Sequence, residues 1–544
     1  MRQKGKEMKK TTLELGIPSY IAVETEEKAG TWQFEGTKWT DGDVCVEVDS
    51  GKVFVQAQTS RVKSVRLRFP VPVCGKTRIL GSTWERTYGD TQWMGMSANA
   101  FMPWFFLTSC EEVYRGYGVK VRPSAMCFWQ ADTKGITLFL DVRCGGTGVE
   151  LKGRKLLAAE IVCMEAQECT SFEAAEEFCR CMCTDPILPS FPVYGSNNWY
   201  YAYGDSSQEE ILKDTDYLLE LTKGAENPPY MVIDDCWQEH HRLNDYNGGP
   251  WRKGNSKFPD MKALAEKLEE KGVRPGIWVR FLLNEDTQIP QEWRISHNGC
   301  VDPSHPQALA YIKEDMEQIC QWGYTLIKHD FSTFDMFGRW GLEMNPYPTQ
   351  DGWSFYDKSR TSAEIVKGLY EAIYEVAKKY DALVLGCNTI GHLGAGLMHM
   401  HRTGDDTSGF TWERTRRMGV NTLAFCLPQH RTFYEIDADC VGITGKIPWE
   451  MNRQWADVIA ESGTSLFVSA KPGVLTEEQE EELHQIMLKA SLQKKHKIPA
   501  DWEYTDCPEI WEDQEERIEY NWYEEAGTDT RGNTYQYYRH IPLS

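Results

Sequence analysis

The sequence predicts an α/β fold: a (β/α)8 TIM barrel preceded by an N-terminal antiparallel β-sandwich domain, with a short C-terminal β-rich appendage. In the first part of the chain, short segments alternate apolar and polar residues, as in KVFVQAQ at 52–58, and Gly, Asn and Asp turns separate them. That pattern is typical of antiparallel strands. Farther along, apolar runs alternate with amphipathic helical stretches. Eight such units over about 290 residues match the number and the length of a (β/α)8 barrel.

Changes in composition give the expected domain boundaries. The β-sandwich occupies 1–185, and a linker with three prolines, TDPILPSFPVYG at 184–195, leads out of it. The barrel then extends over 186–492. The acidic and aromatic segment 493–544 forms the β-rich appendage.

Each expected barrel strand is a short apolar run with a polar or charged residue near its end. Helical periodicity in the intervening stretches, such as SAEIVKGLYEAIYEVAKKY at 362–380, supports the alternation. A doubly wound open sheet is the alternative, but the chain lacks the glycine-rich phosphate turn which that fold would need. The eight runs are 193–199, 229–237, 274–281, 324–331, 382–389, 397–405, 422–427 and 464–470.

Charge and composition exclude several classes of protein. The chain has 59 Lys and Arg against 81 Asp and Glu, a net charge of −22, which argues against nucleic acid or an anionic membrane surface as partner. No apolar run is long enough for a membrane helix, and the basic N-terminus does not resemble a signal peptide. The 17 cysteines suggest neither a disulfide framework nor a zinc cluster. We therefore expect a cytoplasmic protein without metal or cofactor, and the sequence leaves open whether it forms a homo-oligomer.

A lysine and an aspartate lie at the end of the fourth run, YTLIKHDFST at 324–333. Lys328 and Asp330 are two residues apart, so on a strand both side chains point to the same side. An adjacent ammonium favours the ionised form of a carboxylate, which suits Asp330 to act as a nucleophile. The alternative is an ion pair that serves only the stability of the barrel.

Other expected strands also end in polar residues, at the end of a barrel where active sites lie. A retaining glycosidase needs two carboxyl groups about 5–5.5 Å apart, one as nucleophile and one as acid/base. Asp405 or Asp406, after the sixth strand, suits the acid. The remaining strand-end candidates for the site are Trp199, Asp234, Asp235, Trp237, Arg280, Cys387, Asn388 and Arg402.

Six motifs, in order along the barrel, resemble those of the retaining α-galactosidase clan of glycoside hydrolases. The resemblance is strongest to family 36, the α-galactosidases and raffinose synthases, with motifs similar to family 27, and it covers about 190–470. A β-sandwich before the barrel is also a feature of family 36. The motifs are GSNNWYYAYGDSSQEEI (195–211), MVIDDCWQ (231–238), GPWRKGNSKFPDM (249–261), YTLIKHDFST (324–333), CNTIGHLGAGLMH (387–399) and RTGDD (402–406).

The resemblance implies a role for each matching residue. Asp330 becomes the nucleophile that attacks the anomeric carbon. Asp405 becomes the acid/base by alignment of Thr-Gly-Asp, whereas an Arg-x-x-x-Asp spacing counted from Arg402 reaches Asp406 instead. Asp234, Asp235, Lys328 and Arg402 would hold sugar hydroxyls. Trp199 and Trp237 would pack on the sugar or wall the pocket, and Cys387 would lie near it.

Two departures from the family pattern bear on the substrate. Arg280 stands where the family usually has an acid, and the segment 391–394 lacks the family's arginine. The hypothesis is an exo-acting hydrolase of terminal α-galactosyl-type residues on a small carbohydrate. An extra arginine would suit a carboxylate or sulfate on the substrate. The alternatives are a raffinose-synthase-like transglycosylase, an α-N-acetylgalactosaminidase, a modified-galactoside hydrolase and a non-catalytic carbohydrate-binding relic.

Overall fold

The computed structural model describes residues 8–245, 248–492 and 496–522. It also gives the backbone of three short strands, β28 (Gly527–Thr528), β29 (Thr534–Gln536) and β30 (Ile541–Pro542). The rest of the expected appendage lies outside the described residues. Within them, no helix combines the length and the apolar composition that a membrane crossing requires.

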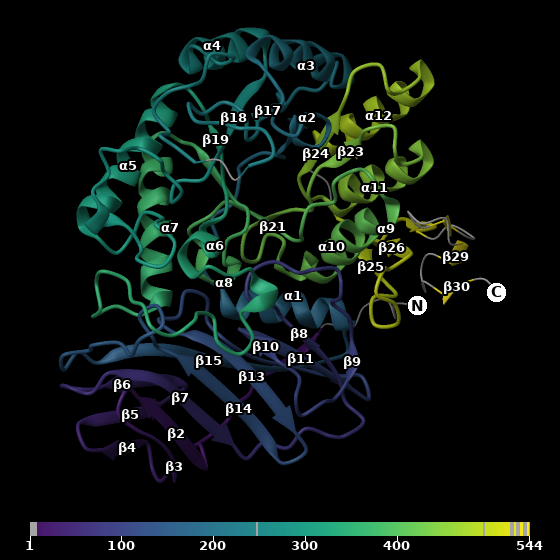
Figure 1. Ribbon diagram of the computed structural model, residues 1–544. Helices are drawn as coiled ribbons and strands as arrows, with labels where there is room; N and C mark the ends of the chain where they lie inside the picture. Colours follow the sequence, from purple (N-terminus) through teal and green to yellow (C-terminus); the bar gives the residue numbers. More distant parts are fainter. Residues whose placement is uncertain are drawn as a thin grey trace.

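Two antiparallel sheets form the N-terminal part of the chain (Figure 1). Rings from the two sheets meet in the core, where Phe106 on β11 lies 6.2 Å from Trp129 on β13 between ring centroids. The first sheet has the order β4 (Lys38–Asp41), β5 (Val44–Asp49), β6 (Lys52–Gln56), β15 (Leu156–Gln167), β12 (Val113–Val119), β11 (Phe105–Cys110), β8 (Arg78–Gly81) and β9 (Met94–Gly95), with β1 (Lys9–Thr12) also on β15. The second has the order β10 (Met102–Pro103), β13 (Met126–Asp132), β14 (Gly135–Asp141), β7 (Val62–Phe69), β2 (Tyr20–Thr25) and β3 (Ala29–Gln33).

A curled sheet of nine parallel strands forms the larger part of the molecule (Figure 1). Nearly every residue of these strands is buried, as expected for parallel strands covered on both faces. The order is β22 (Glu435–Asp437), β21 (Met400–Arg402), β20 (Leu383–Gly386), β19 (Leu326–His329), β18 (Arg274–Val279), β17 (Tyr230–Ile233), β16 (Tyr194–Asn197), β24 (Leu466–Ala470) and β23 (Val441–Ile443). Seven of the eight expected runs contain the strands β16 to β21 and β24.

The two end strands of this sheet, β22 and β23, are consecutive in the sequence. Asp437 forms an isolated parallel bridge with Ser465, just before β24, and the Ser465 N–H donates to the Ile436 carbonyl at 3.1 Å. The segment 435–443 therefore contacts β21 at its beginning and β24 at its end. The sheet thus curls far enough for its two sides to meet.

The prediction of a strand at 422–427 is wrong. Thr422–Cys426 is the helix α10, within a helical stretch that begins at α9 (Trp412–Thr415), passes through a π-helical segment (Arg416–Asn421) and ends at η4 (Leu427–Gln429). A short apolar run cannot be assigned to strand or buried helix by periodicity alone. The next strands of the parallel sheet after β21 are β22 and β23, which come later in the chain.

Helices surround the parallel sheet (Figure 1). Four of them begin at a Ser, Asp or Thr whose side chain accepts a hydrogen bond from the backbone of the first turn: Ser207, Asp260, Thr361 and Thr476. The main helices are α3 (Gln208–Leu221), α4 (Met261–Lys271), α5 (Pro306–Gln321), α7 (Ser362–Lys379), α11 (Trp449–Ser462) and α12 (Glu477–Ala490). After them, β25 (Ile498–Pro499), β26 (Ile510–Glu512) and β27 (Arg517–Glu519) form a small antiparallel sheet.

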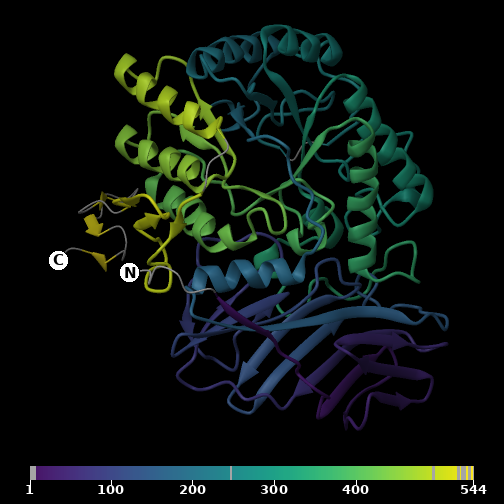
Figure 2. The ribbon, with the colours of Figure 1, turned by 180° about the vertical axis from the view of Figure 1, so that it is seen from behind.

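Helix α1 (Ser171–Met182) lies between the antiparallel sheets and the curled sheet, as both Figure 1 and Figure 2 show. It contacts β12 on one side and η4 on the other. Gly116 on β12 makes the close approach possible, because a Cβ there would lie 2.4 Å from the Phe178 ring. The absence of a side chain at residue 116 therefore sets how closely the helix packs.

We expect Gly116→Ala to destabilise the protein by roughly 1–3 kcal/mol, because the buried Phe178 ring has no room to move without strain. The measurement is the midpoint of thermal or urea unfolding. Gly75→Ala is the matched control, since a Cβ at Gly75 meets no atom within 4 Å. Equal stability of the two variants would contradict this account of the packing.

Candidate active site

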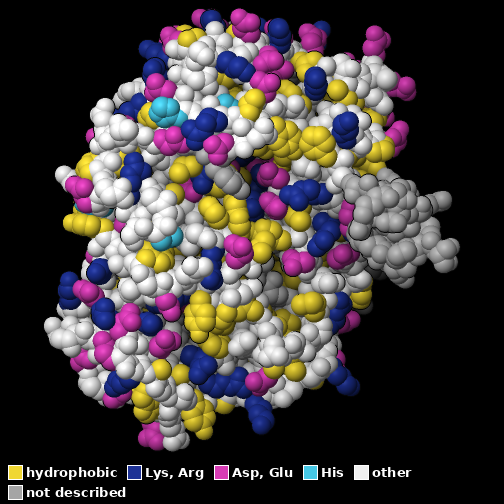
Figure 3. All heavy atoms as spheres, in the orientation of Figure 1, with side chains coloured by type: hydrophobic (Ala, Val, Ile, Leu, Met, Phe, Trp, Pro, Cys, Tyr) yellow, Lys and Arg dark blue, Asp and Glu magenta, His cyan; other side chains and the backbone are white. Residues whose placement is uncertain are grey.

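The carboxyl ends of the parallel strands surround a cavity of about 390 Å³, named here the central cavity. Its walls carry both carboxylates and cations, and Figure 3 shows such side chains around a hollow near the middle of this face. This is the end of a curled parallel sheet at which ligands bind. Lining residues are Arg86, Tyr88, Trp199, Asp234, Asp235, Asp245, Trp278, Arg280, Lys328, Asp330, Phe331, Trp340, Leu342, Asn388, Asp405 and Asp406.

Asp330 lies directly after β19 and is held by three hydrogen-bond donors. Its Oδ2 accepts from Trp278 Nε1 at 2.9 Å, and its Oδ1 accepts from Asn388 Nδ2 at 2.5 Å and from the Phe331 N–H at 2.6 Å. The left-handed backbone of Phe331 (φ 65°) directs its N–H back to the carboxylate. These three hydrogen bonds fix the orientation of the carboxylate at the cavity wall.

The structure corrects the expected pairing of Lys328 with Asp330. Lys328 Nζ on β19 lies 2.8 Å from Oδ2 of Asp234, which follows β17. The strand β18 lies between them in the sheet, and both side chains are buried. Burial alone lowers the pKa of Lys328, but neighbouring acidic groups, with Asp234 the strongest of them, together outweigh it and raise that pKa well above its ordinary value. The lysine therefore stays charged, and its main partner is Asp234.

Two asparagines at the end of β16 position Asp234, the first of two carboxylates after β17. Asn197 Nδ2 donates to Asp234 Oδ2 at 2.6 Å, and the Asp234 N–H donates to Asn198 Oδ1 at 2.8 Å. Asp235 Oδ1 accepts from Gln238 Nε2 at 2.6 Å. The end of β16 thus holds Asp234, and the loop after β17 holds Asp235, at the cavity wall.

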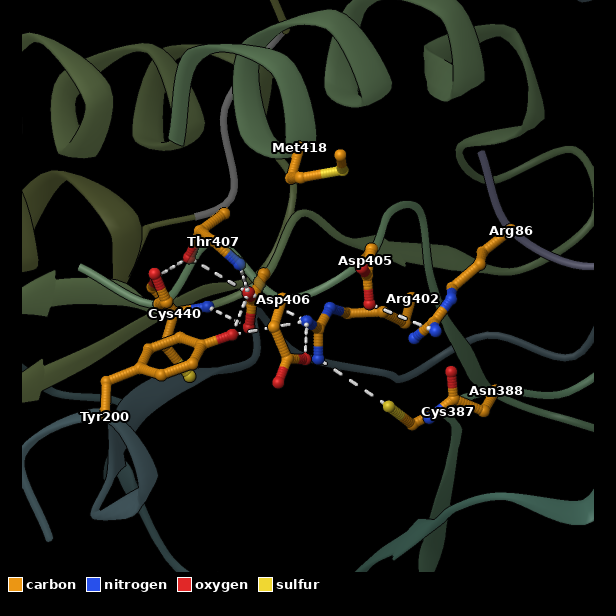
Figure 4. Close-up of polar contacts among 12 residues, drawn as sticks. Arg86, Tyr200, Cys387, Asn388, Arg402, Asp405, Asp406, Thr407, Met418 and Cys440 are labelled. Atoms are coloured by element: carbon orange, nitrogen blue, oxygen red, sulfur yellow. Dashed lines mark hydrogen bonds and ion pairs between the residues drawn. The ribbon is translucent and has the colours of Figure 1, made fainter. Parts of the chain in front are cut away.

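Asp405 and Asp406 follow β21 and have different partners (Figure 4). Both oxygens of Asp405 contact guanidinium groups, Oδ1 at 3.0 Å from Arg86 and Oδ2 at 3.0 Å from Arg414. Asp406 Oδ1 accepts from Arg402 at 2.8 Å, and the side chain is 42% exposed, toward the central cavity. Guanidinium groups therefore hold both oxygens of Asp405, whereas one oxygen of Asp406 faces the cavity.

Nearby cations control the proton affinity of Asp406. Desolvation in the cavity raises its pKa, but Arg402, Arg86 and Lys328 outweigh that effect, so the pKa lies below its ordinary value. Arg402 also lies 2.7 Å from Asp439, a buried carboxylate after β22 that accepts hydrogen bonds from Tyr200 and Thr407. Burial raises the pKa of Asp439 to about 6 despite Arg402.

Arg86, between β8 and β9, is a site residue that the sequence reasoning missed. Its guanidinium lies over the Tyr88 and Trp340 rings at 5.4 Å and 5.3 Å, and it is 6% exposed. The Thr87 N–H donates to the Thr403 carbonyl at 2.9 Å, which joins this segment to the loop after β21. No local motif marks Arg86, because its partners are distant in the sequence. Trp278 was missed as well, although it lies in the predicted third strand.

Three predicted binding residues lie behind the cavity wall. Trp237 is fully buried and donates to the Trp278 carbonyl at 2.9 Å, so it belongs to the core. Arg402 is also buried and faces Asp406 and Asp439, and Cys387 lies 3.6 Å behind it. These residues can support the site but do not line it.

Arg280 does line the cavity, but its charge is already balanced. It contacts the buried Asp335 at 2.6 Å and packs on the Phe331 ring at 4.1 Å. This corrects the expectation that Arg280 would suit an acidic group on the substrate. In contrast, Trp199, Asp234, Asp235, Lys328, Asn388 and both candidate acids lie at the cavity as predicted.

Two histidines at the sixth predicted strand, His399 and His401, both contact backbone groups. His399 Nδ1 accepts from the Val384 N–H at 3.1 Å, and His401 Nε2 lies 3.1 Å from the Thr389 carbonyl. Among the described residues, no group of three or more His, Cys, Asp and Glu side chains is placed to hold a metal ion.

A curled parallel sheet with carboxylates from separate strands around one cavity is the arrangement of barrel-type glycoside hydrolases. No protein-family profile matches the chain.

In sequence, the chain is similar to α-galactosidases. The relative from Cyamopsis tetragonoloba is 25% identical over 169 residues, 31% of this chain and 36% of the relative. The relative from Oryza sativa subsp. japonica is 28% identical over 142 residues, 26% of this chain and 29% of the relative. The matched segments thus span about a third of those proteins.

Solved structures share the fold over nearly the whole chain. An α-galactosidase from Thermus thermophilus in complex with p-nitrophenyl α-D-galactopyranoside has a TM-score of 0.56 at 15% identity, over 92% of this chain and 99% of that one. A family 31 sulfoquinovosidase from E. rectale has a TM-score of 0.55 at 11% identity, over 95% and 91%. The chain thus resembles the α-galactosidase-like clan of glycoside hydrolases, with the architecture of family 36.

We expect Lys328→Met to destabilise the protein by about 3–5 kcal/mol, because it leaves the buried Asp234 without its cation. Lys313→Met is the matched control. It removes an ion pair with Glu375 of the same 2.8 Å length, with side chains 41% and 66% exposed, which is worth at most about 1 kcal/mol. Denaturant midpoints of the two variants compare the losses. Similar losses would show that the buried pair contributes no more than a surface pair.

Proposed function

We propose that the protein is a retaining exo-glycosidase that removes terminal α-galactosyl-type residues by double displacement, with Asp330 as nucleophile and Asp406 as acid/base. The observation that carries the proposal is that these two carboxylates come from different strands and line one small cavity. Sequence similarity to α-galactosidases supports the choice of sugar.

The proposed reaction balances in two steps. The Asp330 carboxylate attacks the anomeric carbon and forms an ester, while the leaving-group oxygen takes a proton from Asp406. A water molecule then loses a proton to Asp406 and attacks the same carbon, which releases Asp330. The bonds from Trp278, Asn388 and the Phe331 N–H keep Asp330 oriented for both steps.

The partners of the two candidate acids favour Asp406 over Asp405. A guanidinium on each oxygen of Asp405 occupies the positions from which that carboxyl group would donate a proton to the leaving group. Asp406 has one guanidinium contact and faces the cavity. Asp405 then serves to fix Arg86 and Arg414 around the acid.

The remaining cavity residues suit a neutral sugar. Asp234, Asp235 and Lys328 can bond to hydroxyl groups, and Trp199 can pack on a sugar face. Because Lys328 and Arg280 each have a carboxylate partner, the described cations leave little excess positive charge for an acidic substrate.

We further propose that the curled sheet is a (β/α)8 barrel whose seventh strand is interrupted between β22 and β23. The bridge between Asp437 and Ser465 supports this closure. The three units at 1–185, 186–492 and 493–544 remain our proposed domain division. A cytoplasmic location, supported by 17 free cysteines, is likewise a proposal.

We expect Asp330→Ala and Asp406→Ala to lower kcat for an α-galactoside by at least about 10²-fold, because each removes a group needed in both steps. Azide distinguishes the roles. It should restore turnover of an activated aryl galactoside in Asp406→Ala with an α-galactosyl azide product, and give a β-azide with Asp330→Ala. Product anomers are identified by NMR.

Asp405→Ala is the matched control for that experiment. Rescue by azide in Asp405→Ala, with none in Asp406→Ala, would assign the acid/base to Asp405. Absence of turnover by the wild type on α-galactosides would overturn the proposed function.

We expect Arg86→Gln to move the alkaline limb of the kcat/KM profile about one pH unit upward, a shift typical of the loss of a nearby charge. The sign follows from the electrostatics: Arg86 lowers the pKa of Asp406, so without Arg86 the acid stays protonated to higher pH. Arg86→Lys, which keeps the charge, should retain most of the wild-type profile. An unchanged profile in Arg86→Gln would remove Arg86 from the electrostatics of the acid.

A further inference from the structure

Three aromatic side chains extend from the central cavity to the surface. Trp199 lines the cavity, Tyr203 lies 5.2 Å from it between ring centroids, and Phe410 lies 5.5 Å from Tyr203. Tyr203 is 37% exposed and Phe410 is 44% exposed. Hydrophobic side chains lie over the region of α2 (Trp199–Ala202), beside the hollow in Figure 3. We name Trp199, Tyr203 and Phe410 the aromatic platform.

The backbone has an unusual conformation at Tyr203 and at Ser408, two residues before Phe410. Tyr203 has φ 45° and Ser408 has φ 66°, both in the left-handed region that non-glycine residues rarely adopt. The Tyr203 hydroxyl donates to the Ser408 carbonyl at 3.4 Å, which joins the two loops. Gly409 packs so closely on Gly442 that a Cβ would lie 2.7 Å from the Gly442 Cα. A strained backbone and close packing are used here to hold rings that stay exposed to solvent. Such an arrangement points to a role of the rings other than stability.

The aromatic platform lies on the side of the proposed acid. Phe410 follows Asp406 by four residues on the same loop. Tyr203 also lies 6.2 Å between ring centroids from Tyr200, whose hydroxyl accepts from Arg402, the cation partner of Asp406. A general acid protonates the oxygen of the leaving group, and the leaving group must therefore lie on that side of the bond that breaks.

We propose that Trp199, Tyr203 and Phe410 form a binding site for the leaving group of the substrate, and that they select leaving groups with a flat apolar face. This inference rests on the proposed function. A pyranose ring and an aryl group both present such a face, and either can pack on an aromatic ring. The exposed rings would thus favour an oligosaccharide or an aryl glycoside over a substrate whose leaving group is small.

The test compares three substrates: α-galactosyl fluoride, which has almost no leaving-group surface, 4-nitrophenyl α-galactoside, and the disaccharide α-galactosyl-(1→6)-glucose. For each variant, kcat/KM for the latter two is divided by kcat/KM for the fluoride. Phe410→Ala and Tyr203→Asn are the variants, and asparagine is chosen because it tolerates the left-handed backbone of residue 203.

We expect at least one ratio to fall about tenfold in both variants, the factor typical of one lost aromatic contact. A fall for the disaccharide identifies a sugar as the natural leaving group, and a fall for the nitrophenyl glycoside alone identifies an aryl group. Tyr504→Ala is the control, since Tyr504 is 82% exposed and does not line the cavity, and it should leave both ratios unchanged.

Unchanged ratios in both platform variants would overturn the inference while leaving the proposed hydrolase intact. A second measurement does not need turnover: calorimetric titration of Asp330→Ala with the disaccharide and with galactose. The two affinities are then compared again after Phe410→Ala is added to Asp330→Ala. If the difference between the two ligands disappears, the result supports the aromatic platform, and if the difference is unaltered, the result overturns it. A wild type that cleaves none of the three substrates would overturn the proposed function itself.

Discussion

The need to balance buried charges at one end of the parallel sheet is the constraint on which the whole site depends. Curling the sheet brings the carboxyl ends of its strands together, and several of them end in aspartates. A buried carboxylate without a partner is very costly. Lys328 balances Asp234, Arg402 serves Asp406 and Asp439 together, and Arg86 contacts Asp405. The positions of the cations therefore determine which carboxylates are held by ion pairs on both oxygens and which one faces the cavity.

Arg402 contacts two carboxylates, Asp406 and Asp439, whose pKa values shift in opposite directions. Asp439 is buried and its pKa is raised to about 6, whereas the pKa of the more exposed Asp406 is lowered. Tyr200 on α2 and Thr407 on the loop after β21 donate hydrogen bonds to Asp439. Because both carboxylates contact the same guanidinium, a change at either one reaches the other through Arg402.

Sequence patterns predicted the part of the fold and site that depends on local order. Polar residues at the ends of apolar runs identified Asp234, Asp330 and Asp406 as cavity residues, because strand direction alone sends those ends to the same edge. Spacing could not reveal that Lys328 pairs with Asp234 on another strand. The helix at 422–426 was mistaken for a strand because burial on all sides gives both elements the same apolar composition. Arg86 was out of reach, since only the docking of a distant segment brings it to Asp405.

The bond between Thr87 and Thr403 has a consequence for the timing of biosynthesis. A ribosome completes the segment that carries Arg86 long before it reaches the loop that carries Asp405 and Asp406. Until that loop emerges and docks, Arg86 lacks its contact with Asp405, and the central cavity has only part of its lining. The complete lining of the central cavity would then form only late in synthesis, when the loop after β21 docks on the segment between β8 and β9.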